Sequence, residues 1–259
     1  MTAVALHHHA DGPRGAPVVV LGSSLGTAAE MWRPQLPALA ARLRVIRYDH
    51  RGHGGSPVDD RPCEIADLGR DVLALLDRLG IERASFGGFS LGGMVAIWLG
   101  ANASDRVDRL VLCCTAAHMP PASAWAERAA AVRAAGTTEV VADAVVARWL
   151  TPGFAERRPD LVEWLRGMLV ATPAAGYAAC CGAIERMDMR ADLERIAAPT
   201  LVVSAAEDPA TPPEHQRRLA AGIRGARLEP IAGAAHLAGV ERTEQVNRLM
   251  LEHLEQAAA

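Results

Sequence analysis

The feature that most constrains the fold is a short turn at residues 88–92, which reads GFSLG. An apolar run at residues 84–87 precedes this turn, and a helical pattern over residues 92–101 follows it. Small residues two positions before and after a serine let a strand turn sharply into a helix and lift the hydroxyl out of the sheet. This context favours a nucleophilic Ser90 over the alternative, in which the serine only caps a glycine-rich helix.

The same turn supplies one of two expected donors for a developing oxyanion. The N–H of Leu91 lies at the start of the predicted helix, where the backbone dipoles favour negative charge. The second donor is expected from residues 21–27, LGSSLGT, which follow the first predicted strand. We expect the N–H of Leu25 to be this donor, with Ser24 as the next choice. For Gly26 a plain glycine turn is also an adequate interpretation.

A serine hydroxyl needs a base to take its proton and an acid to orient that base. In folds built around such a turn, the chain order is serine, then acid, then histidine. Asp208 follows the apolar run PTLVVS at residues 199–204 and is the expected acid. Glu207 is the rival acid, and Asp192 is a more distant third.

The expected base is His236, which follows the last predicted strand at residues 226–231. The neighbouring histidines in the sequence are His215 and His253. Both lie in predicted helices, and we expect both at the surface. A histidine after the last strand, in the required order, is the one that favours catalysis.

Short apolar runs alternate with longer helical patterns along much of the chain. This rhythm predicts a parallel sheet covered by helices on both faces. Strands are predicted at residues 16–21, 44–48, 84–87, 109–113, 199–204 and 226–231, and helices at residues 31–43, 65–79, 92–101, 214–221 and 241–257.

The rhythm is interrupted at residues 118–193, where the pattern is mostly helical and contains no strong strand. We therefore predict an α/β fold with a mostly parallel sheet of the eight-stranded type. Its core comprises residues 1–117 and 194–259. Residues 118–193 form a helical cap, or lid, inserted between the sixth and seventh main strands.

Composition excludes several kinds of partner. The formal net charge of −3 argues against nucleic acid. Because every basic residue is arginine, an anion site must use arginine or backbone N–H groups.

The cysteines and the apolar segments bear on the cellular location. The five cysteines have no zinc or redox spacing and are expected to be buried, reduced thiols of a cytoplasmic protein. We see no signal peptide, and Pro173, Gly176 and Gly182 argue against a membrane span at residues 167–184. A homo-oligomer is left open.

Residues 48–56, YDHRGHGGS, resemble the Y-D-x-R-G-H-G-x-S loop of the α/β-hydrolase superfamily. The resemblance extends over essentially the whole chain. We expect Asp49, Arg51 and His53 to be structural groups that hold a tight loop through hydrogen bonds. The alternative is that His53 is a catalytic base.

Four further segments carry a finer resemblance. They are SLGT at residues 24–27 with Met31 and Trp32, the elbow with GMVA at residues 93–96, RLVLCCTAA at residues 109–117, and RWLTPGF at residues 148–154. Together they resemble the 3-oxoadipate enol-lactonases of the β-ketoadipate pathway of aromatic degradation. Members of that family commonly have an asparagine near the position of Ser23. This chain reads GSS there, so a substrate role of that asparagine does not carry over to it.

The resemblance implies hydrolysis of 3-oxoadipate enol-lactone, with Ser90 as nucleophile, His236 as base and Asp208 as its orienting acid. The enol leaves and tautomerises, and water then releases 3-oxoadipate. The reaction implies neither a metal nor an organic cofactor.

This substrate carries a free carboxylate, so an arginine in the cap is expected to pair with it. Arg133 and Arg148 are the candidates, with Trp149 and Trp125 as apolar walls. For each of these residues, a solvated arginine or a core tryptophan is an equally favoured interpretation.

Two other functions share parts of this pattern. One is a cofactor-free, haloperoxidase-like carboxylesterase or perhydrolase, whose pocket would accept neutral esters. The other is a non-catalytic ligand receptor on a hydrolase scaffold, against which the complete set of Ser90, Asp208 and His236 argues.

Overall fold

The computed structural model describes residues 3–59 and 61–255. The strands are β1 (His8–Asp11), β2 (Val18–Gly22), β3 (Arg44–Tyr48), β4 (Ala84–Phe89), β5 (Val107–Cys113), β6 (Thr200–Ala205) and β7 (Arg227–Ile231). They form one seven-stranded sheet within the described residues, in the order β1-β3-β2-β4-β5-β6-β7. Only β1 is antiparallel to its neighbour among these strands. The predicted α/β fold with a mostly parallel sheet is confirmed, with seven strands where the eight-stranded type was expected.

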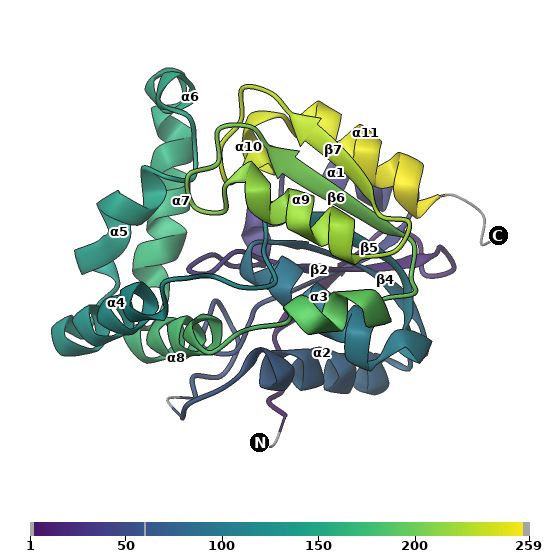
Figure 1. Ribbon diagram of the computed structural model, residues 1–259, viewed down its shortest axis with the longest axis horizontal. Helices are drawn as coiled ribbons and strands as arrows, with labels where there is room; N and C mark the ends of the chain where they lie inside the picture. Colours follow the sequence, from purple (N-terminus) through teal and green to yellow (C-terminus); the bar gives the residue numbers. More distant parts are fainter. Residues whose placement is uncertain (1–2, 60, 256–259) are drawn as a thin grey trace.

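Helices cover both faces of this sheet (Figure 1). On one face lie α2 (Ile65–Leu79) and α3 (Leu91–Asn102), which contact each other. On the other face lie α1 (Leu36–Ala40) and α11 (Thr243–Leu254). The remaining helical elements of this part are η1 (Ala29–Trp32), η2 (Ser104–Arg106), η3 (Arg190–Arg195), α9 (Pro213–Gly222) and α10 (Ala238–Glu241).

The best-predicted helix is α2, whose bounds match the expected residues 65–79. Its start is fixed by a capping box, in which Glu64 and Asp67 each accept a hydrogen bond from the other's backbone N–H. Its end is fixed by Gly80, which adopts a left-handed conformation with φ 67°. Local sequence signals therefore set both ends of this helix.

Two predicted helices are wrong in extent. The helix expected at residues 31–43 is divided into η1 and α1, because Pro34 and Pro37 lack the N–H groups that a continuous helix needs. The helix expected at residues 241–257 is divided into α10 and α11. The division falls at Arg242, whose φ of −127° is not helical. Residues 256 and 257 of that prediction lie outside the described residues.

Between β5 and β6 the chain forms a group of helices, which we call the helical insertion (residues 118–193). It was expected between the sixth and seventh strands, and it lies one strand earlier because the sheet has seven described strands where eight were expected. These helices lie beyond the carboxyl ends of the central strands, at the left of Figure 1. An antiparallel bridge between His118 and Asp188 joins the two ends of the insertion. The helices are α4 (Ala122–Ala135), α5 (Glu139–Val146), α6 (Pro152–Arg157), α7 (Pro159–Ala171) and α8 (Ala174–Glu185).

In the described ranges, no single helix is long and apolar enough to cross a membrane, although α7 and α8 together meet that length and composition across a 93° bend. The expectation of buried, reduced thiols is confirmed. The five cysteines are all buried and unpaired: Cys63, Cys113, Cys114, Cys180 and Cys181.

Candidate active site

Ser90 occupies the sharp turn between β4 and α3, as the elbow pattern predicts. Its φ is 53°, an uncommon value for a residue with a side chain. A β-carbon on Gly88 would lie 2.2 Å from the carbonyl carbon of Gly92, and one on Gly92 would lie 2.1 Å from the carbonyl oxygen of Gly22. The turn is therefore only compatible with glycine at both flanking positions.

Backbone and side-chain hydrogen bonds hold this strained turn in place. The Ser90 N–H donates to the carbonyl of Cys113 at 3.0 Å. The hydroxyl of Thr115 donates to the Ser90 carbonyl at 2.6 Å. Both partners lie at or just beyond the end of β5, so the neighbouring strand fixes the position of Ser90.

Asp208 and His236 meet at the same edge of the sheet, after β6 and β7. The Nδ1 atom of His236 lies 2.9 Å from Oδ2 of Asp208. The same oxygen accepts a hydrogen bond from the Thr211 hydroxyl at 2.6 Å. The backbone N–H groups of Ala210 and Thr211 donate to the other oxygen at 2.8 and 2.9 Å. Burial opposes ionisation of Asp208, but His236 and these hydrogen bonds together hold its pKa below the ordinary value.

Neither of the two rival acids, Glu207 and Asp192, occupies the position that Asp208 takes beside His236. Glu207 is exposed, and Asp192 pairs with Arg195 at 3.0 Å. The surface expectation is wrong for His253, which is only 5% exposed and lies 3.2 Å from the carbonyl of Pro199. His215 is half-buried on α9.

The loop after β2 contains the two candidate donors for the oxyanion, the backbone N–H groups of Ser24 and Leu25. The Ser24 N–H contacts the sulfur of Met31 at 3.2 Å, and the Gly26 N–H donates to Nε2 of His53 at 3.1 Å. In the described part of the chain, the N–H groups of Leu25 and Leu91 make no such hydrogen bond. Leu25 also lines the cavity that contains Ser90. These two groups are therefore available to a ligand, whereas that of Ser24 is occupied.

Two buried histidines hold this loop. His50 donates from Nε2 to the Ser23 carbonyl at 3.0 Å, and His53 accepts from Gly26 as described above. Burial lowers the pKa of His50 to about 3 and also lowers the pKa of His53, so both rings are neutral at neutral pH. Both ring nitrogens of His53 are engaged, because its Nδ1 lies 3.1 Å from the carbonyl of Arg51. These contacts support a structural role for His53 and not the alternative of a catalytic base.

Asp49 and Arg51 also make buried hydrogen bonds and ion pairs with other parts of the chain. Asp49 accepts hydrogen bonds from the N–H groups of Ala29 and Gly55 at 2.6 and 2.9 Å. Arg51 makes a two-point ion pair with Asp71, with both contacts at 2.7 Å. The loop at residues 48–56 therefore holds the loop after β2 in place through hydrogen bonds.

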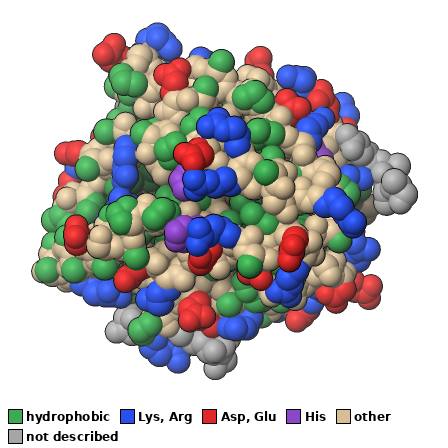
Figure 2. Space-filling view, viewed as in Figure 1, with side chains coloured by type: hydrophobic (Ala, Val, Ile, Leu, Met, Phe, Trp, Pro, Cys, Tyr) green, Lys and Arg blue, Asp and Glu red, His purple; other side chains and the backbone are tan. Residues whose placement is uncertain are grey.

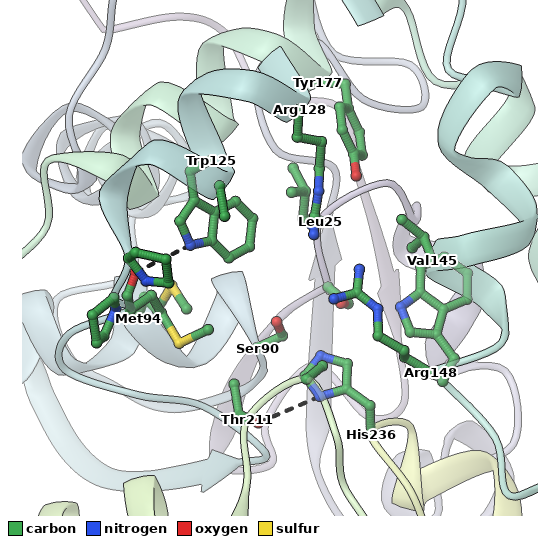
Figure 3. A pocket seen from close by; sticks show the side chains of 17 residues that line it. Leu25, Ser90, Met94, Trp125, Arg128, Val145, Arg148, Tyr177, Thr211 and His236 are labelled. Atoms are coloured by element: carbon green, nitrogen blue, oxygen red, sulfur yellow. Dashed lines mark hydrogen bonds between the residues drawn. The ribbon is translucent and has the colours of Figure 1, made fainter. Parts of the chain in front are cut away.

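Ser90 and His236 open onto a cavity of about 210 Å³ between the sheet and the helical insertion. The predicted residues Trp125, Arg148 and Trp149 also line this cavity. Figure 3 shows Trp125 on one side of the space and Arg148 on the other, with Ser90 between them. On the face seen in Figure 2, the surface is hollowed between the insertion and the sheet, and hydrophobic side chains gather around the hollow.

The prediction for Arg133 is wrong, because this residue lines a different cavity with Pro62 and Gly182. The cavity of Ser90 instead receives Arg128, from the same helix α4. Five residues along a helix correspond to a rotation of about 140°, so the two side chains leave the helix on different sides. The spacing from Trp125 was the available signal, because residues three apart share a helix face.

Comparison with known families agrees with this geometry. Residues 17–148 match the family model described as the alpha/beta hydrolase fold, and residues 172–258 match one described as TAP-like protein. The chain therefore belongs to the α/β-hydrolase family.

Several similar proteins are named as hydrolases of a particular substrate. The 3-oxoadipate enol-lactonase 2 of Acinetobacter baylyi is 39% identical, over 94% of this chain and 91% of the relative. The crystal structure of the enol-lactonase from Burkholderia xenovorans LB400 has 40% identity and a TM-score of 0.94, covering 97% and 96% of the two chains. RutD of Variovorax paradoxus, named as a candidate carbamate hydrolase, is 33% identical over 98% and 97%. The chain is thus a hydrolase that resembles 3-oxoadipate enol-lactonase.

Proposed function

We propose that this chain hydrolyses 3-oxoadipate enol-lactone to 3-oxoadipate, a step of the β-ketoadipate pathway of aromatic degradation. The observation that carries the proposal is the position of His236, which lies 2.9 Å from Asp208 and lines one cavity with Ser90 and with basic side chains. The similarity to enol-lactonases supports the substrate. Because the lactonase relative is 39% identical and RutD is 33% identical, we prefer a lactone to a carbamate.

In the proposed mechanism, His236 takes the proton of the Ser90 hydroxyl as its oxygen attacks the lactone carbonyl. Asp208 holds the imidazole in the required tautomer and stabilises its charged form. The N–H groups of Leu25 and Leu91 receive the oxyanion, and one such donor contributes about 3 kcal/mol to stabilising the transition state.

Ring opening breaks the bond between the carbonyl carbon and the ring oxygen. His236 returns its proton to the leaving enol, which tautomerises to the ketone. A water molecule then attacks the carbonyl of the Ser90 ester and gives a proton to His236. The bond between the carbonyl carbon and the Ser90 oxygen breaks, His236 returns the proton to that oxygen, and the second carboxylate is released. These steps use groups of the chain and water only.

The proposal assigns the carboxylate of the substrate to the helical insertion, which acts as a cap over a core of residues 1–117 and 194–259. Arg148 pairs with the carboxylate, and Trp125 and Trp149 provide apolar walls. The partner is thus a small anionic lactone. Five free, buried thiols support a reducing compartment such as the cytoplasm.

The direct test compares hydrolysis of the enol-lactone with hydrolysis of p-nitrophenyl acetate, an uncharged ester. We expect a higher kcat/KM for the lactone. In Arg148→Gln, we expect KM for the lactone to rise about tenfold or more, because a charge-assisted hydrogen bond is lost. The same variant should leave the uncharged ester nearly unaffected.

The matched control is Arg133→Gln, which removes an arginine that lines another cavity. Hydrolysis of the neutral ester alone would contradict the lactonase proposal and favour the haloperoxidase-like carboxylesterase. Absence of turnover with both substrates would favour the non-catalytic receptor.

A further inference from the structure

One end of the Ser90 cavity is lined by polar groups from three segments of the insertion. Arg128 lies on α4, Arg148 follows α5, and Tyr177 lies on α8. Figure 3 shows both guanidinium groups and the Tyr177 hydroxyl facing the same space, next to Leu25 and Ser90. The proposed function uses only one of these groups, Arg148.

The Tyr177 hydroxyl has no hydrogen-bond partner among the described residues, although its side chain is 0% exposed. Burial of the ring raises the pKa of this hydroxyl, and the nearby guanidinium of Arg128 opposes this rise only in part. The hydroxyl therefore remains neutral, and its own proton is free to be donated. A buried hydroxyl without a partner is costly, so an acceptor on a ligand is the expected complement.

The two arginines also have no acidic partner in the part of the chain that the structure describes. Arg128 stacks on the ring of Trp125, with 4.6 Å between its guanidinium carbon and the ring centroid. Arg148 donates from Nε to the carbonyl of Ala144 at 3.2 Å. The carboxylate of Asp208 is already committed to His236 and Thr211.

The two guanidinium groups repel each other. Burial lowers the pKa of Arg148, and the charge of Arg128 lowers it further. Both side chains nevertheless stay charged at neutral pH, because an arginine is not deprotonated under these conditions. The cavity thus contains two half-buried positive charges that form no salt bridge with a described acidic side chain, and a bound anion would offset them.

This charge exceeds what the proposed substrate supplies. The enol-lactone has one carboxylate, whereas its hydrolysis product has two. An anion with two carboxylates would place one charge beside each guanidinium group and relieve their repulsion.

We propose that the cavity is a binding site for linear dicarboxylates, in which Arg128 and Tyr177 together hold the second carboxylate. The inference rests on the proposed function for the role of Arg148. The guanidinium of Arg128 pairs with this carboxylate, and the hydroxyl of Tyr177 donates a hydrogen bond to it. Dicarboxylates of the length of the product therefore compete with the lactone for the cavity. The product is one of them, so it inhibits turnover of the lactone.

The test measures the dissociation constants of adipate and hexanoate, two acids of equal length, by calorimetric titration of the unmodified chain. Neither acid is hydrolysed, so binding is measured independently of catalysis. We expect adipate to bind about tenfold more tightly or better, because it makes the additional charge-assisted contacts. Arg128→Gln should abolish this preference, and Tyr177→Phe should reduce it severalfold.

The control is Arg133→Gln, which removes an arginine from the same helix but from outside this cavity. It should preserve the preference for adipate. Equal binding of the two acids to the unmodified chain would overturn the inference, as would an unchanged preference in both Arg128→Gln and Tyr177→Phe. Lactone turnover is assayed separately. A chain that opens the lactone but does not prefer adipate refutes only the inference, whereas one that prefers adipate but opens no lactone refutes only the proposed function.

Discussion

Gly176 of α8 lies directly against Gly52, in the loop that follows β3. A β-carbon on Gly52 would come within 2.3 Å of the Gly176 α-carbon, and one on Gly176 would come within 2.3 Å of the Gly52 carbonyl oxygen. The insertion thus contacts the rest of the chain backbone to backbone at this point. Tyr177 is the next residue, so this contact sets how far its side chain reaches into the cavity.

We expect Gly176→Ala to push α8 away from the loop. Overpacking of this kind costs about 1 to 3 kcal/mol in the free energy of unfolding. Displacement of Tyr177 should also raise KM for the lactone more than it lowers kcat. Urea unfolding and steady-state kinetics measure the two effects.

The matched control is Gly167→Ala on α7, where an added β-carbon meets no atom within 4 Å. Alanine in a helix interior should leave this variant as stable as the unmodified chain or stabilise it by about 1 kcal/mol. Equal stabilities for the two variants would show that the Gly52–Gly176 contact is not tight.

Thr211 acts as a positioning residue for the acid. Its hydroxyl donates to Asp208 at 2.6 Å, and this hydrogen bond helps to hold the pKa of Asp208 below its ordinary value. Thr211→Val should lower kcat about tenfold, because a hydrogen bond to a charged group is lost. Loss of this hydrogen bond raises the pKa of Asp208, so the acidic limb of the profile of kcat against pH should move to higher pH.

The control is Thr243→Val, which removes a hydroxyl that donates to the Gly239 carbonyl. A uniform loss of activity without a change in the pH profile would argue for a packing role only.

Buried histidines should make the fold sensitive to acid. The pKa of His50 is lowered to about 3 by burial, and that of His253 to about 4 by burial, whereas an unfolded histidine titrates near about pH 6.5. Below that pH the unfolded chain binds more protons than the folded chain, so the free energy of unfolding decreases as the pH falls. Each such histidine contributes a slope of up to about 1.4 kcal/mol per pH unit.

Urea unfolding between neutral pH and mildly acidic pH measures this slope. His50→Gln keeps a donor for the Ser23 carbonyl but does not titrate, so the slope should become shallower. His9→Gln, at a half-exposed position in β1, should leave it unchanged. An identical slope in His50→Gln would contradict the assignment.

The parts of the site that follow strands could be predicted from sequence. Ser90, Asp208 and His236 each come within a few residues after the end of a strand, and parallel strands bring their carboxyl ends to one edge of the sheet. Leu25 could be placed for the same reason. Short-range patterns therefore determine where these residues lie, although the residues are far apart in the sequence.

The lining contributed by the insertion could be predicted only in part. Helix α4 has alanine on nearly every side, so hydrophobic periodicity does not indicate which face is buried, and Arg133 was chosen in place of Arg128. Tyr177 was missed because its place depends on the close approach of Gly176 to Gly52. The three histidines at residues 7–9 indicate an exposed strand end, but the sequence does not define the extent of β1. Its four residues, HHAD, form no apolar run and depend on pairing with β3.

The central claim is that Ser90 is a nucleophile activated by His236. The most direct measurement is labelling of the folded chain with a fluorophosphonate, followed by mass spectrometry of the peptides. We predict a single adduct on Ser90, no adduct in Ser90→Ala, and labelling at least about a hundredfold slower in His236→Ala, because the general base is lost. An unmodified chain that opens the lactone while Ser90 stays unlabelled, or a Ser90→Ala variant with undiminished turnover, would contradict the claim.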